Sequence, residues 1–159
     1  MHTFDASTKV VHGASIAHIG SGATMAATSI CAASISTALT STNLLSYQRC
    51  DLVLTYVPAS TTSSTAMTIP VYRRDLDVGG LTTADDAAPA VLNSNKFVGL
   101  FQIPSSLSTG TYTMTLIDIP LPGGNAGCEF WLQNSFSTNL ENAGWALTVI
   151  PKTDVGATT

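Results

Sequence analysis

The chain has 159 residues, a mass of 16.5 kDa and a formal net charge of −4 at pH 7, which suits a single domain of ordinary size. Charged residues make up 10% of the chain, against roughly 25% in typical domains, whereas Thr, Ser and Ala together supply 59 residues. An acidic chain with so few basic residues lacks the clustered Lys and Arg that phosphate binding needs, which argues against a nucleic-acid partner.

The N-terminal part carries weak patterns. Residues 1–23 hold few bulky apolar side chains, and we interpret them as an extended N-terminal arm in which Val10 and Val11 form a short strand. The arm lacks the basic stretch and apolar run of a secretory signal. No stretch approaches the roughly 18 apolar residues of a membrane span, so we expect no membrane partner. Residues 24–39 are rich in Ala, but their Thr, Ser and Ile weaken a helix and favour a strand with small side chains.

From residue 49 onward, short apolar runs alternate with Pro, Gly and Asn. The clearest strand covers residues 111–119, where Tyr112, Met114 and Leu116 alternate with threonines in the period of a half-buried strand. Further strands are predicted over residues 50–57, 67–73, 97–103, 128–133 and 145–150. The acidic residues 75–95 are typical of a long loop.

This spacing of strands predicts the fold class. Six or seven short strands with frequent turn signals and no convincing long helix indicate an all-β fold, an antiparallel β-sandwich or jelly roll with an extended N-terminal arm. We expect one domain over residues 1–159, divided into the arm (1–23), the sandwich (24–153) and a flexible tail (154–159).

Three cysteines, Cys31, Cys50 and Cys128, are far apart and form no Cys-x-x-Cys pair. Free cysteines are usually small core residues, so we expect all three to be reduced. The chain therefore resembles a product of a reducing cytosol, although its surface chemistry, poor in Lys and rich in Ser and Thr, is typical of an exported or assembled protein.

No catalytic group stands out. Residues 13–17 lack the last glycine of a Gly-x-Ser-x-Gly elbow. His2, His12 and His18 lie in the weakly patterned arm, where a general base would be poorly held, so we expect exposed or loop histidines. We therefore predict that the chain is not an enzyme and has no cofactor.

The acidic stretch is the strongest metal candidate. Asp75, Asp77 and Asp86 offer carboxylate ligands for Ca²⁺, but Gly79 stands where the Ca²⁺-loop pattern requires an oxygen ligand. The alternative is that the acids form exposed ion pairs with the neighbouring arginines at 73–74, which contribute little stability.

One tryptophan is a candidate contact residue. If Phe130 faces the core, the alternation of a strand places Trp131 on the outer face between Glu129 and Gln133. Because Trp is enriched at interface centres, an exposed Trp131 indicates contact with a partner. Two alternatives are a sugar-binding platform and coverage of the ring by the N-terminal arm.

The chain resembles small β-sandwich virion proteins of tailed bacteriophages, especially head decoration (cement) proteins. The resemblance rests on the Ser/Thr/Ala composition and on residues 97–104, 111–122, 128–132 and 143–151. It implies a non-enzymatic structural protein, often trimeric, that is made in the host cytoplasm and resides on the capsid surface of the virion. Its partners would be the major capsid protein lattice and further copies of itself.

We expect Trp131, Glu129, Gln133, Val10 and Val11 to lie at the interface with these partners. Removing residues 1–20 should weaken attachment more than it destabilises the domain. A carbohydrate-binding β-sandwich module, or a tail or fibre component that adheres to the host surface, is the alternative function.

Overall fold

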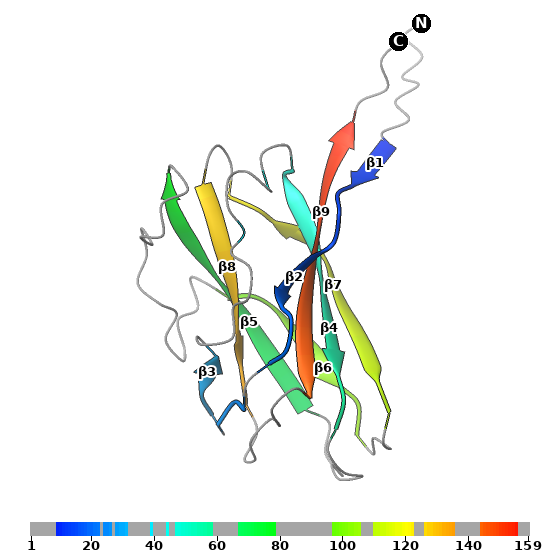
Figure 1. The fold of residues 1–159 in the computed structure, drawn as a ribbon, viewed down its shortest axis with the longest axis vertical. Coiled ribbons are helices and arrows are strands. Elements are labelled where there is room, and N and C mark those ends of the chain that lie inside the picture. Colours follow the sequence, from blue (N-terminus) through cyan, green and yellow to red (C-terminus); the bar gives the residue numbers. More distant parts are fainter. Residues whose placement is uncertain are drawn as a thin grey trace, which may run out of the picture.

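The computed structural model describes residues 9–22, 24–26, 28–31, 39, 44, 47–58, 67–78, 97–105, 110–122, 126–135 and 144–155. The described residues form two antiparallel sheets, which confirms the predicted all-β sandwich (Figure 1). The strands are β1 (Lys9–His12), β2 (Ile16–Ile19), β3 (Ile30–Cys31), β4 (Arg49–Tyr56), β5 (Met67–Val78), β6 (Phe97–Ile103), β7 (Tyr112–Pro120), β8 (Ala126–Gln133) and β9 (Trp145–Val155).

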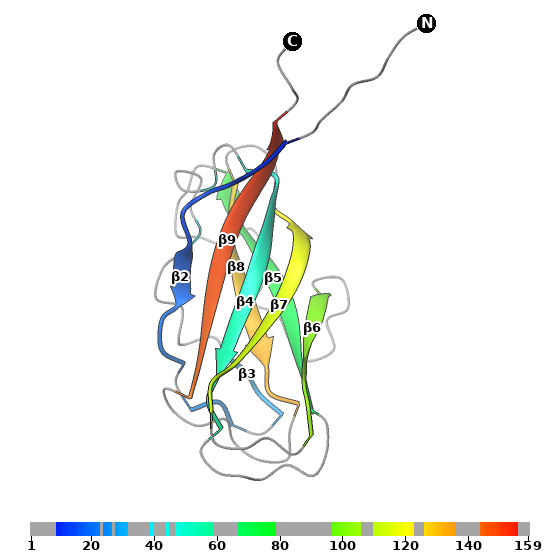
Figure 2. The same cartoon turned by 90° about the vertical axis from the view of Figure 1, so that its right-hand side faces the viewer.

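The two sheets stack face to face (Figure 2). The larger sheet has the order β1-β9-β4-β7, and β2 also pairs with β9. The smaller sheet has the order β3-β8-β5-β6. Consequently β7 ends one sheet and β6 ends the other, and both edge strands lie on the same side of the sandwich.

Alternating side chains of both sheets fill the space between them. The burial of β4 and β9 alternates along each strand, as expected when one face of a strand meets the core. The fully buried residues with the largest side chains are Phe101, Phe130, Ile19, Leu39, Leu52, Leu54, Ile69, Ile103, Leu132, Leu147 and His18. Phe130 therefore faces the core, as the interpretation of residues 128–133 assumed.

The extended N-terminal arm is not confirmed. Both β1 and β2 pair with β9 as part of the larger sheet, and Ile19 is fully buried. Two glycines let this segment lie close to its neighbours. A Cβ on Gly22 would lie 1.9 Å from the Trp145 ring, and one on Gly13 would lie 2.6 Å from the Tyr47 ring.

The continuous strand predicted over residues 24–39 is wrong. Thr28 has a φ of 58°, and the Ser29 N–H and hydroxyl both donate to the Ala26 carbonyl. This turn ends the extended backbone before β3 begins. Residues 32–38 lie outside the described part of the chain.

Two strands are longer than predicted. β5 continues through Val78, into the stretch predicted as a loop, because β8 begins early enough to pair Ala126 with Val78. β9 continues to Val155, because β1 pairs with its last residues. Residues 79–95 of the predicted loop and residues 156–159 of the predicted tail lie outside the described residues.

The described cysteine side chains match the prediction for reduced core thiols. Cys50 and Cys128 are free and fully buried. Burial raises the pKa of Cys50 to about 12 and also raises the pKa of Cys128. Both are therefore neutral thiols at physiological pH and poor nucleophiles. The side chain of Cys31 lies outside the described part.

Candidate interaction site

The end of β9 and the whole of β1 form a two-stranded ribbon, Lys9–His12 against Lys152–Val155, that projects from the body of the sandwich (Figures 1 and 2). Its apolar side chains are exposed: Val10 by 44%, Val11 by 36% and Val155 by 44%. Successive residues of a strand point to opposite faces, so Val10 and Val11 give both faces of the ribbon an apolar residue.

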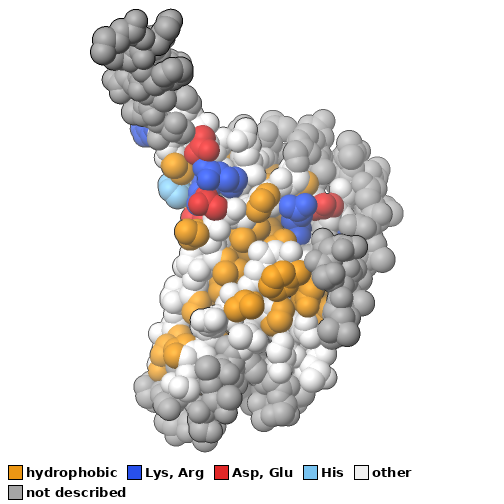
Figure 3. Space-filling view, turned by 180° about the vertical axis from the view of Figure 1, so that it is seen from behind, with side chains coloured by type: hydrophobic (Ala, Val, Ile, Leu, Met, Phe, Trp, Pro, Cys, Tyr) orange, Lys and Arg blue, Asp and Glu red, His pale blue; other side chains and the backbone are white. Residues whose placement is uncertain are grey.

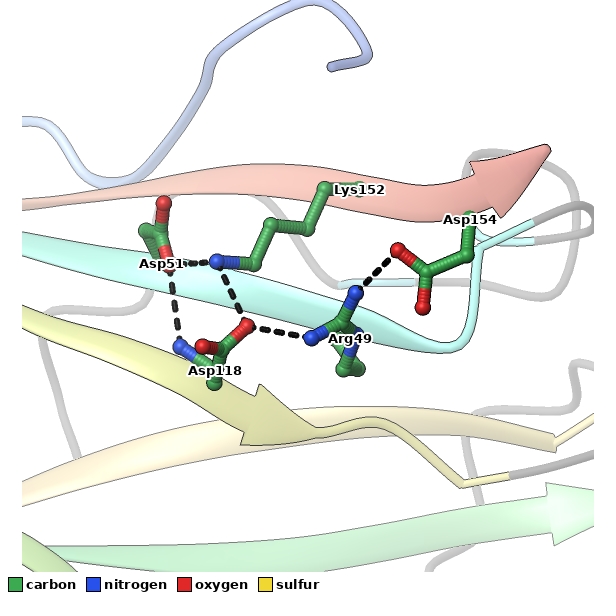
Figure 4. Close-up of polar contacts among 5 residues, drawn as sticks. All are labelled: Arg49, Asp51, Asp118, Lys152 and Asp154. Carbon is green, nitrogen blue, oxygen red and sulfur yellow. Dashed lines mark hydrogen bonds and ion pairs between the residues drawn. The ribbon is translucent and has the colours of Figure 1, made fainter. Parts of the chain in front are cut away.

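A cluster of charged side chains lies at the base of this β1–β9 ribbon (Figure 4). The ion-pair cluster consists of Arg49, Asp51, Asp118, Lys152 and Asp154. The Lys152 Nζ lies 2.6 Å from an Asp51 oxygen and 2.8 Å from an Asp118 oxygen. Arg49 bonds the same Asp118 oxygen at 2.6 Å and also pairs with Asp154. The cluster therefore joins three strands, β7, β4 and β9.

Lys152 is the centre of this cluster. Its side chain is only 8% exposed, so it can remain charged only with nearby carboxylates. Burial lowers the pKa of Lys152, whereas the hydrogen bonds that it donates to Asp118 and Asp51 raise it by a larger amount in total. The pKa of Lys152 therefore lies above its ordinary value of 10.5. The hydrogen bond from Lys152 is the main cause that lowers the pKa of Asp118 below 3.8.

The backbone of β7 is shaped to serve the cluster. The β4–β7 register shifts between Cys50 and Leu52, and Asp118 adopts a φ of 59°. This bulge turns the Asp118 N–H toward an Asp51 oxygen, to which it donates at 3.0 Å. Bulges at a sheet edge commonly redirect a side chain, and here the β4–β7 pairing resumes beyond the bulge at Cys50↔Ile119.

Sequence reasoning missed the cluster because its members are distant in the chain. Arg49 and Asp154 lie 105 positions apart, and the antiparallel pairing of β4 with β9, which sets Arg49 opposite Lys152, brings them together. The signal that could have found the cluster is the small number of basic residues in the chain. In a chain with six basic residues, two of them at the ends of predicted strands indicate paired charges rather than a solvated surface.

A second surface feature lies between the two edge strands. A groove of about 440 Å³ is lined by Leu100, Phe101, Gln102, Met114, Thr115 and Leu116. The same two strands carry exposed apolar side chains: Phe97 is exposed by 45%, Leu100 by 38% and Ile117 by 67%. Figure 3 shows apolar side chains gathered on one face of the molecule, between and below two groups of charged side chains.

The expectation of an exposed Trp131 is wrong. Trp131 lies on the face of β8 that points away from the core, as predicted. Its side chain is nevertheless covered, with only 7% exposed. Its indole N–H donates to Glu129 at 3.1 Å, and the Arg74 guanidinium lies 5.4 Å from the ring centroid. Gln133 is also buried and accepts a hydrogen bond from the Tyr72 hydroxyl at 2.8 Å. The Trp131 ring is therefore covered and offers no open aromatic platform for a sugar.

Asp75 is the one calcium candidate whose side chain lies in the described part of the chain. Asp75 lies within β5 and pairs with Arg73 at 2.8 Å, as in the ion-pair alternative. The side chain of Asp77 and the whole of Asp86 lie outside the described part. Within the described part, no group of three or more His, Cys, Asp or Glu side chains could hold a metal.

The prediction of exposed or loop histidines is wrong for His18. His12 is exposed on the ribbon, but His18 is fully buried in β2, and its Nε2 accepts the Phe130 N–H at 3.0 Å. Because β2 belongs to the larger sheet and β8 to the smaller one, this bond links the two layers. His2 lies outside the described residues.

Comparison of the chain with protein-family models and with curated proteins gave no match. Among the described residues, no helix has the length and apolar character needed to cross a membrane. The function is therefore inferred from the site itself.

Proposed function

We propose that this chain is a non-enzymatic structural protein that attaches to the outside of an assembled phage capsid and reinforces it. The observation that carries the proposal is the β1–β9 ribbon. It stands clear of the sandwich, presents Val10, Val11 and Val155 to solvent, and is held at its base by the ion-pair cluster. An exposed apolar ribbon with a braced base is suited to contact with a neighbour rather than to chemistry.

The energetics of the ribbon favour this role. The three valines are already more than half covered, so burying the rest of each side chain against a partner is worth roughly 0.5–1.3 kcal/mol. Arg49 joins Asp154 of the ribbon to Asp118 of β7, so the ribbon is ordered before it meets a partner, which lowers the entropic cost of binding. The partner that the phage resemblance supports is the lattice of the major capsid protein. The buried position of Trp131 disfavours the carbohydrate-binding alternative, since a sugar platform needs an open ring.

Mass spectrometry of purified particles tests the proposal. The virus that encodes this chain should carry it in its DNA-filled heads, in a fixed ratio to the major capsid protein. Absence from purified particles would overturn the proposal. Recovery only with isolated tails would overturn the capsid location and favour the tail or fibre alternative.

The ribbon itself is tested with capsids assembled without this chain. Substituting Val10→Ser together with Val11→Ser should weaken binding to them by at least about tenfold. The control is Val57→Ser, because Val57 is 41% exposed but lies outside the ribbon. Equal binding by both variants, with unchanged melting temperatures, would exclude the ribbon as the contact.

A further inference from the structure

The edge of β7 that faces away from β4 is a second surface that this role does not use. Among the described strands, β7 pairs only with β4, in the register Tyr112↔Tyr56 to Leu116↔Leu52. The backbone of an edge strand can pair with another strand on its open side, so proteins usually protect such edges with charges, prolines or bulges.

Protection of this edge is confined to its end. The bulge at Ile117 and Asp118 interrupts regular pairing there. Residues 112–116 include neither a charged residue nor a proline, and their register with β4 is regular. This stretch is therefore a regularly paired, uncharged edge that could accept a further strand.

The chemistry of the stretch defines what can pair with it. Thr113 and Thr115 are exposed on the outer face, whereas Tyr112, Met114 and Leu116 are half-buried toward the core. The adjoining groove is uncharged as well. The carboxylate of Asp118, the nearest charge on the strand, already pairs with Lys152 and Arg49. The edge therefore selects an uncharged strand with alternating polar and apolar residues.

We propose that this occupant is β7 of a second copy of the chain. Two β7 strands, paired antiparallel about a twofold axis at Met114, would place Thr113 of each copy opposite Thr115 of the other. Tyr112 would lie opposite Leu116. Thr–Thr and aromatic–aliphatic cross-strand pairs are both favourable, and a self-complementary patch of this kind is what a twofold interface requires. The larger sheets of two copies then form one continuous sheet.

The pairing explains the exposed residues around the edge. Leu100 and Met114 line the groove, and Ile117 lies immediately after the paired stretch, so a second copy would cover apolar surface in addition to the backbone. The proposed dimer does not depend on the proposed capsid role. If experiments overturn one of these two proposals, the other still stands. It differs from the trimer that the phage resemblance implies, and the mass in solution separates the two.

Sedimentation velocity of the full chain at concentrations up to tens of micromolar tests the proposal. The expected species has twice the chain mass of 16.5 kDa. A monomer throughout, or a trimer, would overturn the twofold pairing. The proposal would also be overturned if the chain stayed monomeric and its β7 edge bound an uncharged strand from another protein.

Charge variants test the register. Thr113→Lys with Thr115→Lys places like charges opposite each other across the axis and should weaken dimerisation by about tenfold or more. The matched variant, Thr113→Lys with Thr115→Glu, places opposite charges there and should dimerise within about threefold of the original chain. Both threonines are exposed, so melting temperatures should stay close to the original. Equal dimerisation by the two variants would overturn the proposed interface.

Discussion

Lys152 shows how much one residue can depend on its partners in a chain with few charges. Its ammonium group is nearly buried between Asp51 and Asp118, and both carboxylates are within 2.8 Å. Removal of the ammonium group leaves two like charges side by side, one of them on a side chain only 15% exposed. Loss of one partner of such a cluster costs more than the pair contributes in isolation.

We expect Lys152→Met to destabilise the protein by about 2 kcal/mol, because it removes two charge-assisted hydrogen bonds. In a chain of this size that corresponds to a fall of about 5 °C in melting temperature. Thermal denaturation at pH 7 measures the effect. The control is Lys9→Met, since Lys9 is exposed on β1, and equal falls for the two variants would contradict a central role for Lys152.

The pH dependence of this difference follows from the two pKa shifts. The pKa of Asp118 lies below 3.8 in the folded chain, so its contribution is complete above that pH and disappears as the pH falls through the lowered value. The pKa of Lys152 lies above 10.5, so its contribution disappears only as the pH rises through the raised value. The difference in stability between the Lys152→Met variant and the original chain should therefore become smaller below pH 3.8 and above pH 10.5.

At the scale of single residues, sequence periodicity predicted orientation but not burial. The alternation along β8 correctly placed Trp131 opposite Phe130. It could not show that Arg74 would lie over the ring, because Arg74 comes from β5, a strand distant in sequence. His18 illustrates the same limit, since its partner Phe130 is 112 positions away.

At the scale of elements, the long alternating strands were predictable and the short ones were not. β4, β6, β7 and β9 start within one residue of their predicted positions, because each has several alternating residues between turn signals. β2 has four residues and no clear hydrophobic period, and it forms because its backbone pairs with β9. Its packing depends on Gly22, a feature that only the position of Trp145 explains.

We expect Gly22→Ala to destabilise the protein by about 2 kcal/mol, as overpacking in a tight site commonly does. The new methyl group would lie 1.9 Å from an atom of the Trp145 ring, so either the ring or the backbone must move. The Gly22 N–H also donates to the Trp145 carbonyl at 2.7 Å, and a backbone shift would weaken that bond. Urea denaturation measures the change.

Gly110→Ala is the matched control for this substitution. A Cβ at Gly110 has no atom within 4 Å, and replacing a glycine in an ordinary conformation stabilises slightly through the unfolded chain. If both alanine variants unfold at the same urea concentration, the close approach of Gly22 to Trp145 does not contribute to stability.

At the scale of the whole molecule, the two N-terminal strands, β1 and β2, occupy different environments. β1 is exposed along its length and forms one strand of the ribbon. β2 carries His18 and Ile19 into the core and links the larger sheet to the smaller one. The idea that residues 1–20 act mainly in attachment therefore fits β1 and conflicts with the packing of β2.

Two deletions separate the roles of β1 and β2. Removing residues 1–12 takes away only exposed residues of the described part, so the melting temperature should fall by a few degrees at most while capsid attachment is lost. Removing residues 1–20 also takes away Ile19, whose burial alone is worth about 2–5 kcal/mol, and the His18 bond between the sheets. We expect the melting temperature of the longer deletion to fall by about 10 °C or more.

Calorimetry and a capsid-binding assay on both deletions give four values that separate these two roles. The shorter deletion should fold and fail to bind, because the valines of β1 are gone while the core is intact. Equal stability of the two deletions would mean that β2 contributes nothing to the core. Normal binding by the shorter one would move the capsid contact away from the ribbon, to a surface that both chains retain.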